Sequence, residues 1–441
     1  MANFKRSELQ RFVRLREKSP PPVFVGRQSI LNDVLTIAVQ TSQERAGIPG
    51  NTTVIQGAPG AGKSSVLSEL TRFNTDPSEE GSKTLHISSV ELEENFFDVL
   101  MAIGALGRTK KGQLKAHVLK GAQLGSLALL DIAGLIDINI QDVKALFQKN
   151  EVRNIGALHK AFPVSDWDSA VIVAVDEAQN LPFGRGTPQS NFLRALHEAV
   201  TKLPLTLVLA GLGDTQSVIR SMGLTRNQVA TRIGGFTPDE QAELTDRWSA
   251  HFGITIGDQR AHIDQLMMPT DGWPRHVHCA QQALAEALLV KEVDGQADKI
   301  EDWNIVYQRS DTLRQGYYEK QFSDTMKLSR QLTAHIMKTV AHVQKEGKTI
   351  QFDDMLNIAD KYTKRDIPFG WRLPEGETPQ SYVTHLMHCG ALEENPDTGA
   401  LTCPIPSFQN YILRRGGLDP AALEHTLDED ASSFKKEGDN S

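Results

Sequence analysis

The sequence predicts a three-layer α/β fold, in which helices cover both faces of a parallel β-sheet. One indication is the β-branched run Thr52–Gln56, which leads into a glycine-rich loop and then into a helical pattern. Another is the unbroken apolar run over residues 170–175, which ends in Asp176 and Glu177. Strands that are apolar along their whole length are typical of parallel sheets buried on both faces. The two runs therefore predict parallel strands whose carboxyl ends lie at one edge of the sheet.

The loop after the first strand has the composition of a phosphate-binding loop. Residues 57–65 read GAPGAGKSS and match GxxxxGK[ST] at every fixed position. Glycine lacks the Cβ atom that would keep backbone N–H groups away from a triphosphate. Lys63 would supply a charge to the β- and γ-phosphates, and Ser64 a hydroxyl ligand for Mg²⁺. The predicted residues of this ATP and Mg²⁺ site are Gly57, Ala58, Pro59, Gly60, Ala61, Gly62, Lys63, Ser64 and Ser65.

The acidic pair after the second run suits hydrolysis as well as binding. Asp176 would hold the Mg²⁺ through water, and Glu177 is placed to polarise the attacking water. The ordinary alternative is two solvated acids at a strand end, which the phosphate-binding loop upstream disfavours. We therefore expect Asp176 in the metal site and Glu177 as a catalytic residue.

Length and composition exclude several classes of protein. A chain of 441 residues has room for two or three domains. Its net charge of −8 and pI of about 5.9 give no global attraction to nucleic acid, so such a contact must be local. Three cysteines form no disulfide framework, the first residues contain no apolar leader, and no stretch reaches the roughly 18 apolar residues of a membrane span. We expect a soluble, cytoplasmic protein without a membrane partner.

Further patterns divide the chain into domains. Strands are predicted over residues 83–88 and 205–210, and helices over residues 30–41, from a capping box at Thr237 to Gly253, and from Pro274 to about residue 291. Helical patterns over 328–344, 352–362 and 380–389 precede a predicted hairpin of residues 391–394 and 400–405, an order typical of a winged helix. We expect a basic arm (1–22), a nucleotide-binding α/β domain (23–236) with an insertion at about 90–165, a helical lid (237–295), a winged-helix-like domain (310–416) and a disordered acidic tail (417–441).

With these pieces placed, the chain resembles the AAA+ superfamily, within it the branch of origin-initiator and STAND-type ATPases. The resemblance covers about residues 23–290 and, more loosely, 320–415 for the winged helix. Val25-Gly26-Arg27 looks like the element that begins such ATPase modules near the adenine, which implies a nucleotide contact for Arg27. Gly272-Trp273-Pro274-Arg275 resembles the sensor 2 motif, in which Arg275 would reach the γ-phosphate.

Two elements of the resemblance leave alternatives open. Residues 223–226 look like the segment with the arginine finger, which implies that Arg226 acts in trans on the nucleotide of a neighbouring subunit. Arg232 lies only six residues further and is the alternative, since the planar fork of either arginine suits a transferring phosphoryl group. The sensor 1 position falls at residues 210–215, where Asp214 or Thr215 could serve.

Other groups of residues carry weaker hypotheses. Five basic residues of the insertion could line a DNA groove or form a solvated helix face: Arg108, Lys110, Lys111, Lys115 and Lys120. The third helix of the predicted winged helix contains no Lys or Arg, which makes protein docking at least as plausible as DNA reading there. Basic residues around it could still form a rim for a DNA backbone: Lys361, Lys364, Arg365, Arg372, Arg414 and Arg415. His385, His388, Cys389 and Cys403 fit no standard zinc spacing.

The sequence leaves three functional hypotheses. In the first, an ATP-hydrolysing homo-oligomer assembles or switches on DNA with a protein partner, as in replication, transposition or repair. In the second, a STAND-like ATPase of signalling or anti-phage defence regulates a separately encoded effector. In the third, the chain is a nucleotide-gated scaffold inside a larger complex.

Overall fold

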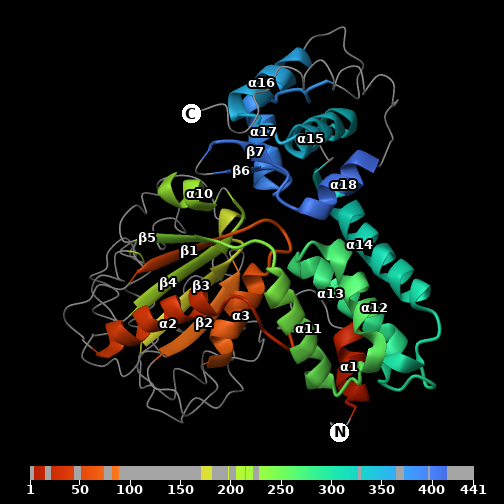
Figure 1. Ribbon diagram of the computed structural model, residues 1–441. Coiled ribbons are helices and arrows are strands. Elements are labelled where there is room, and N and C mark those ends of the chain that lie inside the picture. Colours follow the sequence, from red (N-terminus) through yellow and green to blue (C-terminus); the bar gives the residue numbers. More distant parts are fainter. Residues whose placement is uncertain are drawn as a thin grey trace, which may run out of the picture. The chain divides into compact units, whose positions relative to one another are not determined.

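A computed structural model gives the structure of the chain (Figure 1). It describes residues 4–14, 21–43, 51–73, 82–88, 170–180, 197, 205–213, 215–221, 228–325, 329–363, 372–395 and 398–414. Contacts divide the chain into two compact units. The α/β unit comprises Phe24–Gly57 and Gly62–Ile233, and the helical unit comprises Met1–Val23, Ala58–Ala61 and Gly234–Ser441. The tip of the phosphate-binding loop thus belongs to the helical unit by its contacts, and the rest of that loop to the α/β unit.

The α/β unit is built on a five-stranded sheet in the order β2-β3-β4-β1-β5, in which every pair of neighbours is parallel. Its strands are β1 (Thr52–Gln56), β2 (Ser82–Ser88), β3 (Ala170–Asp176), β4 (Leu205–Gly211) and β5 (Gln228–Arg232). The central strands β3 and β4 are buried along almost their whole length, as their apolar sequences predict. The four predicted strands are confirmed, and β5 is a fifth strand that the sequence pattern did not indicate.

Helices of the α/β unit pack on the sheet, and α3 (Lys63–Phe73) and α10 (Thr215–Ser221) follow the carboxyl ends of β1 and β4. Helices α2 (Gln28–Gln43) and α3 contact each other and both pack on β3 and β4. Leu31 and Val34 on α2 and Leu67 on α3 are fully buried. The short helix α10 packs on β1 and on the 3₁₀ turn η3 (Ala178–Asn180). The α3 and η3 elements are therefore placed to present polar side chains at the edge where β1 and β3 end.

After β5 the chain enters the helical unit, where four helices follow. These are α11 (Pro238–Phe252), α12 (Arg260–Met267), α13 (Pro274–Leu288) and α14 (Trp303–Thr325), with the 3₁₀ turns η4 (Gly257–Gln259), η5 (Met268–Thr270) and η6 (Ala297–Lys299) between them. The predicted capping box is present: the Thr237 hydroxyl accepts from the Glu240 N–H, and the Glu240 carboxylate accepts from the Thr237 N–H. Gly253 ends α11 with a φ of 67°, as a C-terminal glycine should.

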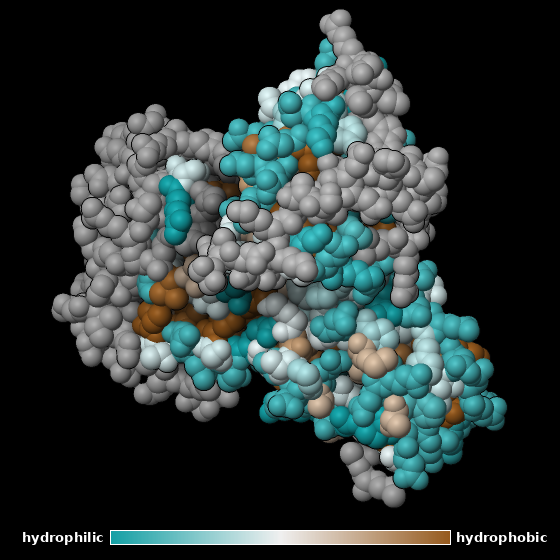
Figure 2. Space-filling model, turned by 45° about the horizontal axis from the view of Figure 1, so that its top comes forward, coloured by the Kyte–Doolittle hydropathy of each residue, from teal (hydrophilic) through white to brown (hydrophobic). Residues whose placement is uncertain are grey.

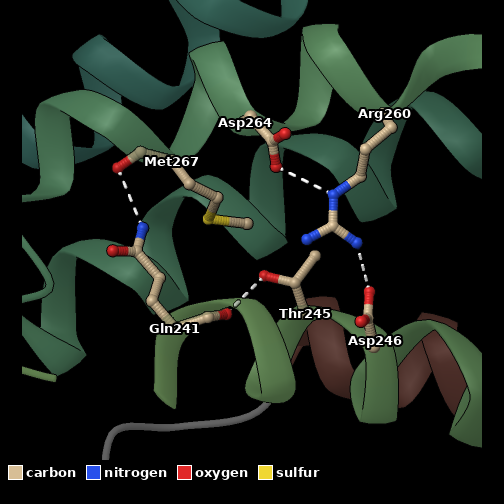
Figure 3. Close-up of polar contacts among 6 residues, drawn as sticks. All are labelled: Gln241, Thr245, Asp246, Arg260, Asp264 and Met267. Atoms are coloured by element: carbon tan, nitrogen blue, oxygen red, sulfur yellow. Dashed lines mark hydrogen bonds and ion pairs between the residues drawn. The ribbon is translucent and has the colours of Figure 1, made fainter. Parts of the chain in front are cut away.

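Polar contacts join α11 to α12 (Figure 3). The Arg260 guanidinium donates to Asp264 on its own helix at 2.9 Å and forms an ion pair with Asp246 on α11. At the other end of the contact, the Gln241 side-chain amide donates to the Met267 carbonyl oxygen at 3.1 Å. Because the Arg260 side chain is 41% exposed, its ion pairs align the helices more than they stabilise them.

The segment predicted as a basic arm contains a helix that packs on this helical unit. Helix α1 (Arg6–Arg14) contacts α11 and α13 and buries Leu9 and Phe12. The Phe12 ring lies 5.6 Å from the ring of Trp248 and 5.7 Å from that of Phe252, centroid to centroid. Arg6 at the start of α1 pairs with Asp294 of the same unit at 2.8 Å. The apolar face of α1 therefore completes the core of this unit.

The last elements follow the predicted order of three helices and a hairpin. They are α15 (Arg330–Lys345), α16 (Phe352–Lys361), α17 (Pro379–His388), the antiparallel pair β6 (Glu393–Glu394) and β7 (Leu401–Thr402), and a further helix α18 (Pro406–Arg414). An isolated bridge joins Gln351 to Ala400 beside this pair. Helix α18 packs on α15 and α14. The arrangement is compatible with the predicted winged helix, which stays a prediction.

The polarity of the described helices and of their surface bears on membrane and docking contacts. Within the described ranges, no helix combines the length and apolar character that crossing a membrane requires. In the view of Figure 2, the coloured surface of the helical unit is mainly hydrophilic. Its most exposed large apolar side chains, Met268 and Ile305, are 72% and 65% exposed. Val290 is the other large apolar side chain of this unit that is exposed among the described residues, at 48%.

Candidate nucleotide-binding site

The phosphate-binding loop lies between β1 and α3, as its motif predicts. Gly57 donates its N–H to the Gly211 carbonyl oxygen at the end of β4, at 3.2 Å. Gly60 and Gly62 have φ values of 81° and 97°, a conformation that side chains with a Cβ atom rarely adopt. Lys63 begins α3, is only 6% exposed, and donates from Nζ to the Gly57 carbonyl oxygen at 2.7 Å. The lysine is thus held inside the curve of its own loop.

Asp176 lies at the end of β3, opposite the start of α3. Burial raises the pKa of its carboxyl group, but the nearby His86 and Ser64 side chains and the Glu177 N–H outweigh that effect and lower the pKa below its ordinary value. The Nε2 atom of His86 on β2 is 3.9 Å from the Asp176 carboxylate, and the Glu177 N–H donates to it at 3.0 Å. The two predicted metal ligands, Ser64 and Asp176, therefore lie near enough for the serine to influence the carboxyl group.

Glu177 follows β3 in an unusual backbone conformation. Its φ is 55°, which a residue with a Cβ atom adopts at an energetic cost, and its side chain is exposed. The buried Gln179 on η3 donates from Nε2 to the Glu177 carboxylate at 2.5 Å. The side-chain amide oxygen Oε1 of Gln179 accepts from the Leu212 N–H just after β4, at 3.1 Å. Gln179 thereby joins the predicted catalytic carboxylate to the end of the neighbouring strand.

The tip of the loop is held by residues of the helical unit. The Trp273 indole and the Tyr317 hydroxyl both donate to the Pro59 carbonyl oxygen, at 3.1 and 3.0 Å. The Arg275 N–H donates to the Gly60 carbonyl oxygen at 3.2 Å, and the Arg275 guanidinium lies 5.7 Å from the centre of the Tyr317 ring. A Cβ atom on Gly60 would come within 3.0 Å of all three side chains. The glycine is thus required by packing as well as by its φ.

The glycine of the GWPR sequence has an equally strict role. Gly272 has a φ of 68°, and a Cβ atom there would lie 2.2 Å from the Phe236 carbonyl oxygen. Pro274 occupies the first turn of α13, where its missing N–H costs no hydrogen bond. This turn fixes where α13 begins and so where Arg275 meets the loop.

Only some of the remaining predicted site residues lie within the described residues. Arg27 precedes α2 and donates to the Gly26 carbonyl oxygen at 2.7 Å, and Val25 beside it is buried. Thr215 is buried at the start of α10, and Arg232 is exposed on β5. Arg226, Asp214, Lys364, Arg365, Arg415, the basic residues of the insertion and the acidic tail lie outside the described residues. The nucleotide contacts of Arg27, Arg226 and Arg275 therefore stay predictions.

Three residues of the site were not singled out from the sequence. His86 is marked only by being a polar residue in a predicted strand, and Gln179 by following Asp176-Glu177-Ala178. Tyr317 lies in a helix without any motif, so no local signal identifies it. Within the described ranges, no cluster of three or more His, Cys, Asp or Glu side chains could hold a metal ion, although Cys389 Sγ lies 3.3 Å from His385 Nε2.

Comparison with solved structures shows the fold. The chain is similar to the ORC2 protein of Aeropyrum pernix, solved in ADPNP and ADP complexes, with a TM-score of 0.51 and 15% identity over 98% of this chain and 100% of that one. It is similar to a Walker-type ATPase of Pyrococcus abyssi with the same TM-score and identity, over 92% of this chain and 100% of that one. No protein-family model and no curated protein sequence matches the chain. The chain has the three-layer α/β P-loop fold of these two proteins.

Proposed function

We propose that the chain binds and hydrolyses ATP. The observation that carries this proposal is the meeting of the phosphate-binding loop with Asp176: Lys63 and Ser64 begin α3, and Ser64 lies near enough to Asp176 at the end of β3 to lower the pKa of its carboxyl group. A loop that presents backbone N–H groups at a helix start suits a triphosphate. The likeness to a Walker-type ATPase supports the same activity.

The residues present fit a magnesium ion. A serine hydroxyl and a carboxylate with a lowered pKa are hard oxygen ligands, the type that Mg²⁺ prefers. Ser64 and Asp176 would hold the ion, Asp176 through water. When bound, Mg²⁺ would neutralise charge on the β- and γ-phosphates. His86 would keep the Asp176 carboxylate oriented and ionised when the ion is absent.

The other residues take complementary roles in the proposal. Lys63 would leave the Gly57 carbonyl oxygen for the phosphates, and Glu177 would accept a proton from the attacking water. Arg275 would sense the γ-phosphate within one subunit, and Arg226 would act on the nucleotide of a neighbouring subunit, with Arg232 as its alternative. Arg27 would lie near the adenine.

Nucleotide binding in this protein would drive assembly or switching rather than metabolism of a small molecule. We propose a homo-oligomer that works on DNA with a protein partner, supported by the fold shared with the ORC2 protein and by the resemblance to origin initiators. Helix α17 contributes no Lys or Arg to a DNA contact. Local DNA contacts would therefore come from the insertion or from Lys361 and Arg372 beside α16 and α17.

The test is phosphate release from Mg·ATP, with and without double-stranded DNA, while the mass in solution is followed. The unchanged chain should turn over ATP, whereas Glu177→Gln should bind ATP and lose roughly 10²- to 10⁴-fold in rate. Glu243→Gln, an exposed acid on α11, is the matched control and should behave like the unchanged chain. Equal turnover by Glu177→Gln would remove Glu177 from its role. A slow monomer that retains ADP and ignores DNA would favour the signalling switch instead.

A further inference from the structure

Two pairs of adjacent residues connect the phosphate-binding loop to the last described helix. On α13, Arg275 contacts the loop, and the next residue, His276, bonds the Ser407 hydroxyl of α18 through Nδ1 at 2.7 Å. On α14, Tyr317 contacts the loop, and the next residue, Tyr318, packs on α18. Figure 1 shows α14 extending from the lid helices to α18. Each pair thus has one member at the loop and one at α18.

The contacts at α18 are buried and aromatic. The Tyr318 ring lies 5.6 Å from the Phe408 ring at an interplanar angle of 29°, and 5.0 Å from the Tyr411 ring. His276 meets Tyr318 edge-on, with 5.0 Å between the ring centres. Its exposed fraction is 0%, and those of Tyr318 and Phe408 are 5% and 1%. We call His276, Tyr318, Ser407 and Phe408 the α18 cluster. Rings packed this way have little freedom, so the cluster fixes both α13 and α14.

The contacts at the loop have a definite direction. Both hydrogen bonds to Pro59 and the one to Gly60 use backbone carbonyl oxygens as acceptors. In a loop that wraps a phosphate, the N–H groups face the anion and the carbonyl oxygens face away. Donors that hold those carbonyl oxygens outward therefore keep the N–H groups directed at the phosphate site. The loop tip would be preorganised before nucleotide arrives.

We propose that Tyr317 is a positioning residue for nucleotide binding, and that the α18 cluster keeps its hydroxyl on the Pro59 carbonyl oxygen. The inference rests on the proposed function and extends it, because it makes the nucleotide affinity depend on how α18 is packed. A partner that displaces α18 would weaken nucleotide binding, and bound nucleotide would strengthen the packing of α18 by the same factor.

The experiment measures the Kd of a fluorescent methylanthraniloyl derivative of ATP with Mg²⁺ for single and double variants. Tyr317→Phe keeps the ring under Arg275 and removes only the hydroxyl, so the Kd should rise about 2- to 12-fold, the value of one hydrogen bond. Ser407→Ala touches the cluster and not the loop, and it should raise the Kd in the same direction. Because both substitutions act on the same contact, the rise in Kd of the double variant should be smaller than the product of the two single-variant rises.

Matched controls remove the same atoms elsewhere in the helical unit. Tyr307→Phe deletes a hydroxyl on the same helix that bonds His262 instead of the loop. Ser249→Ala deletes a buried hydroxyl on α11. Both controls should leave the Kd within twofold of the unchanged chain. If Tyr317→Phe binds as tightly as Tyr307→Phe, if it binds more tightly than the unchanged chain, or if Ser407→Ala has no effect, the proposal is overturned.

A second measurement needs no nucleotide. Amide hydrogen exchange of residues 57–65 in the nucleotide-free protein should become faster in Tyr317→Phe and Ser407→Ala, and not in the controls. Unchanged exchange in both variants overturns the positioning role even where affinities change. If the unchanged chain itself binds no nucleotide, the proposed function fails, while the exchange comparison still decides the inference about the loop.

Discussion

The side-chain amide of Gln179 lies 2.5 Å from the Glu177 carboxylate, and Gln179 also bonds the Leu212 N–H after β4. A single buried amide therefore orients an exposed carboxylate that sits on a backbone with a φ of 55°. A base must point at its water to accept a proton, so its orientation matters as much as its pKa.

Gln179→Leu should slow ATP turnover by about tenfold and leave the Kd for ATP within about twofold, because it removes the orienting contact and no phosphate contact. Turnover under saturating ATP and equilibrium binding measure the two effects separately. Gln282→Leu on α13, also an amide bonded to a carboxylate, is the control and should change neither. A large rise in Kd without loss of the maximal rate would contradict the orienting role.

Lys63→Ala should abolish measurable nucleotide binding at micromolar protein, with a loss of at least about 10- to 150-fold in affinity. The loss follows from removing a charged hydrogen-bond donor from a buried position. Titration calorimetry with ADP or ATP checks the result. Lys345→Ala at the exposed end of α15 is the control, and retained binding by Lys63→Ala would remove the loop from the nucleotide site.

Gly60→Ala should weaken nucleotide binding by about tenfold or more. Its new Cβ atom would lie 2.8 Å from Arg275 Cβ, and its φ of 81° would be strained. Gly316→Ala on α14 is the contrast, because a Cβ atom there meets nothing within 4 Å. That change should leave binding intact and stabilise the helix by up to about 1 kcal/mol. Equal affinities of the two variants would show that the loop tip can move away from Arg275.

His276 should make the helical unit less stable in acid. Burial, together with the charges of Arg314 and Arg275, lowers its pKa to about 3, and Ser407 faces it from α18. The unfolded chain binds a proton near pH 6.5 and the folded chain only near pH 3. The neutral His276 side chain therefore contributes its full stabilisation to the free energy of unfolding above pH 6.5. Below pH 6.5 this contribution falls by up to about 1.4 kcal/mol per pH unit.

Urea unfolding at pH 7.5, 6.0 and 5.0 checks this sign. The free energy of unfolding of the unchanged chain should fall more steeply than that of His276→Gln, and other titrating groups such as Asp271 contribute to both proteins alike. Parallel pH profiles of the two proteins would show that His276 accepts a proton without strain.

Motifs predicted the core of the site better than its surroundings. The GAPGAGKSS loop and the apolar run before Asp176 each combine a fixed spacing with a strand, so their positions in the fold followed directly. The strand β5 was not predicted because its sequence, QVATR, contains only one large apolar residue. That residue, Val229, is 45% exposed at the edge of the sheet. An edge strand does not need the apolar run that marks a central one.

Helix α14 was not predicted from the sequence either, for a different reason. Its buried positions recur every three or four residues on one face, but two of them, Ser310 and Arg314, are polar, and Ile305 is exposed on another face, so no apolar stripe marks the helix. The contact of Tyr317 with Pro59 joins residues 258 positions apart. No local pattern can reveal such a pair, and the coupling of α18 to the loop could be seen only in three dimensions.

Helix α1 also bears on how the protein can be prepared. A shortened protein beginning at Val23 would lose Leu9 and Phe12 and leave the rings of Trp248 and Phe252 open to water. Such a surface favours self-association during expression. The Lys5 N–H bonds the Phe252 carbonyl oxygen, so an affinity tag joined directly ahead of Phe4 would crowd the end of α11. The oligomeric state measured for a shortened or closely tagged protein would then reflect association through exposed aromatic rings instead of nucleotide-driven assembly.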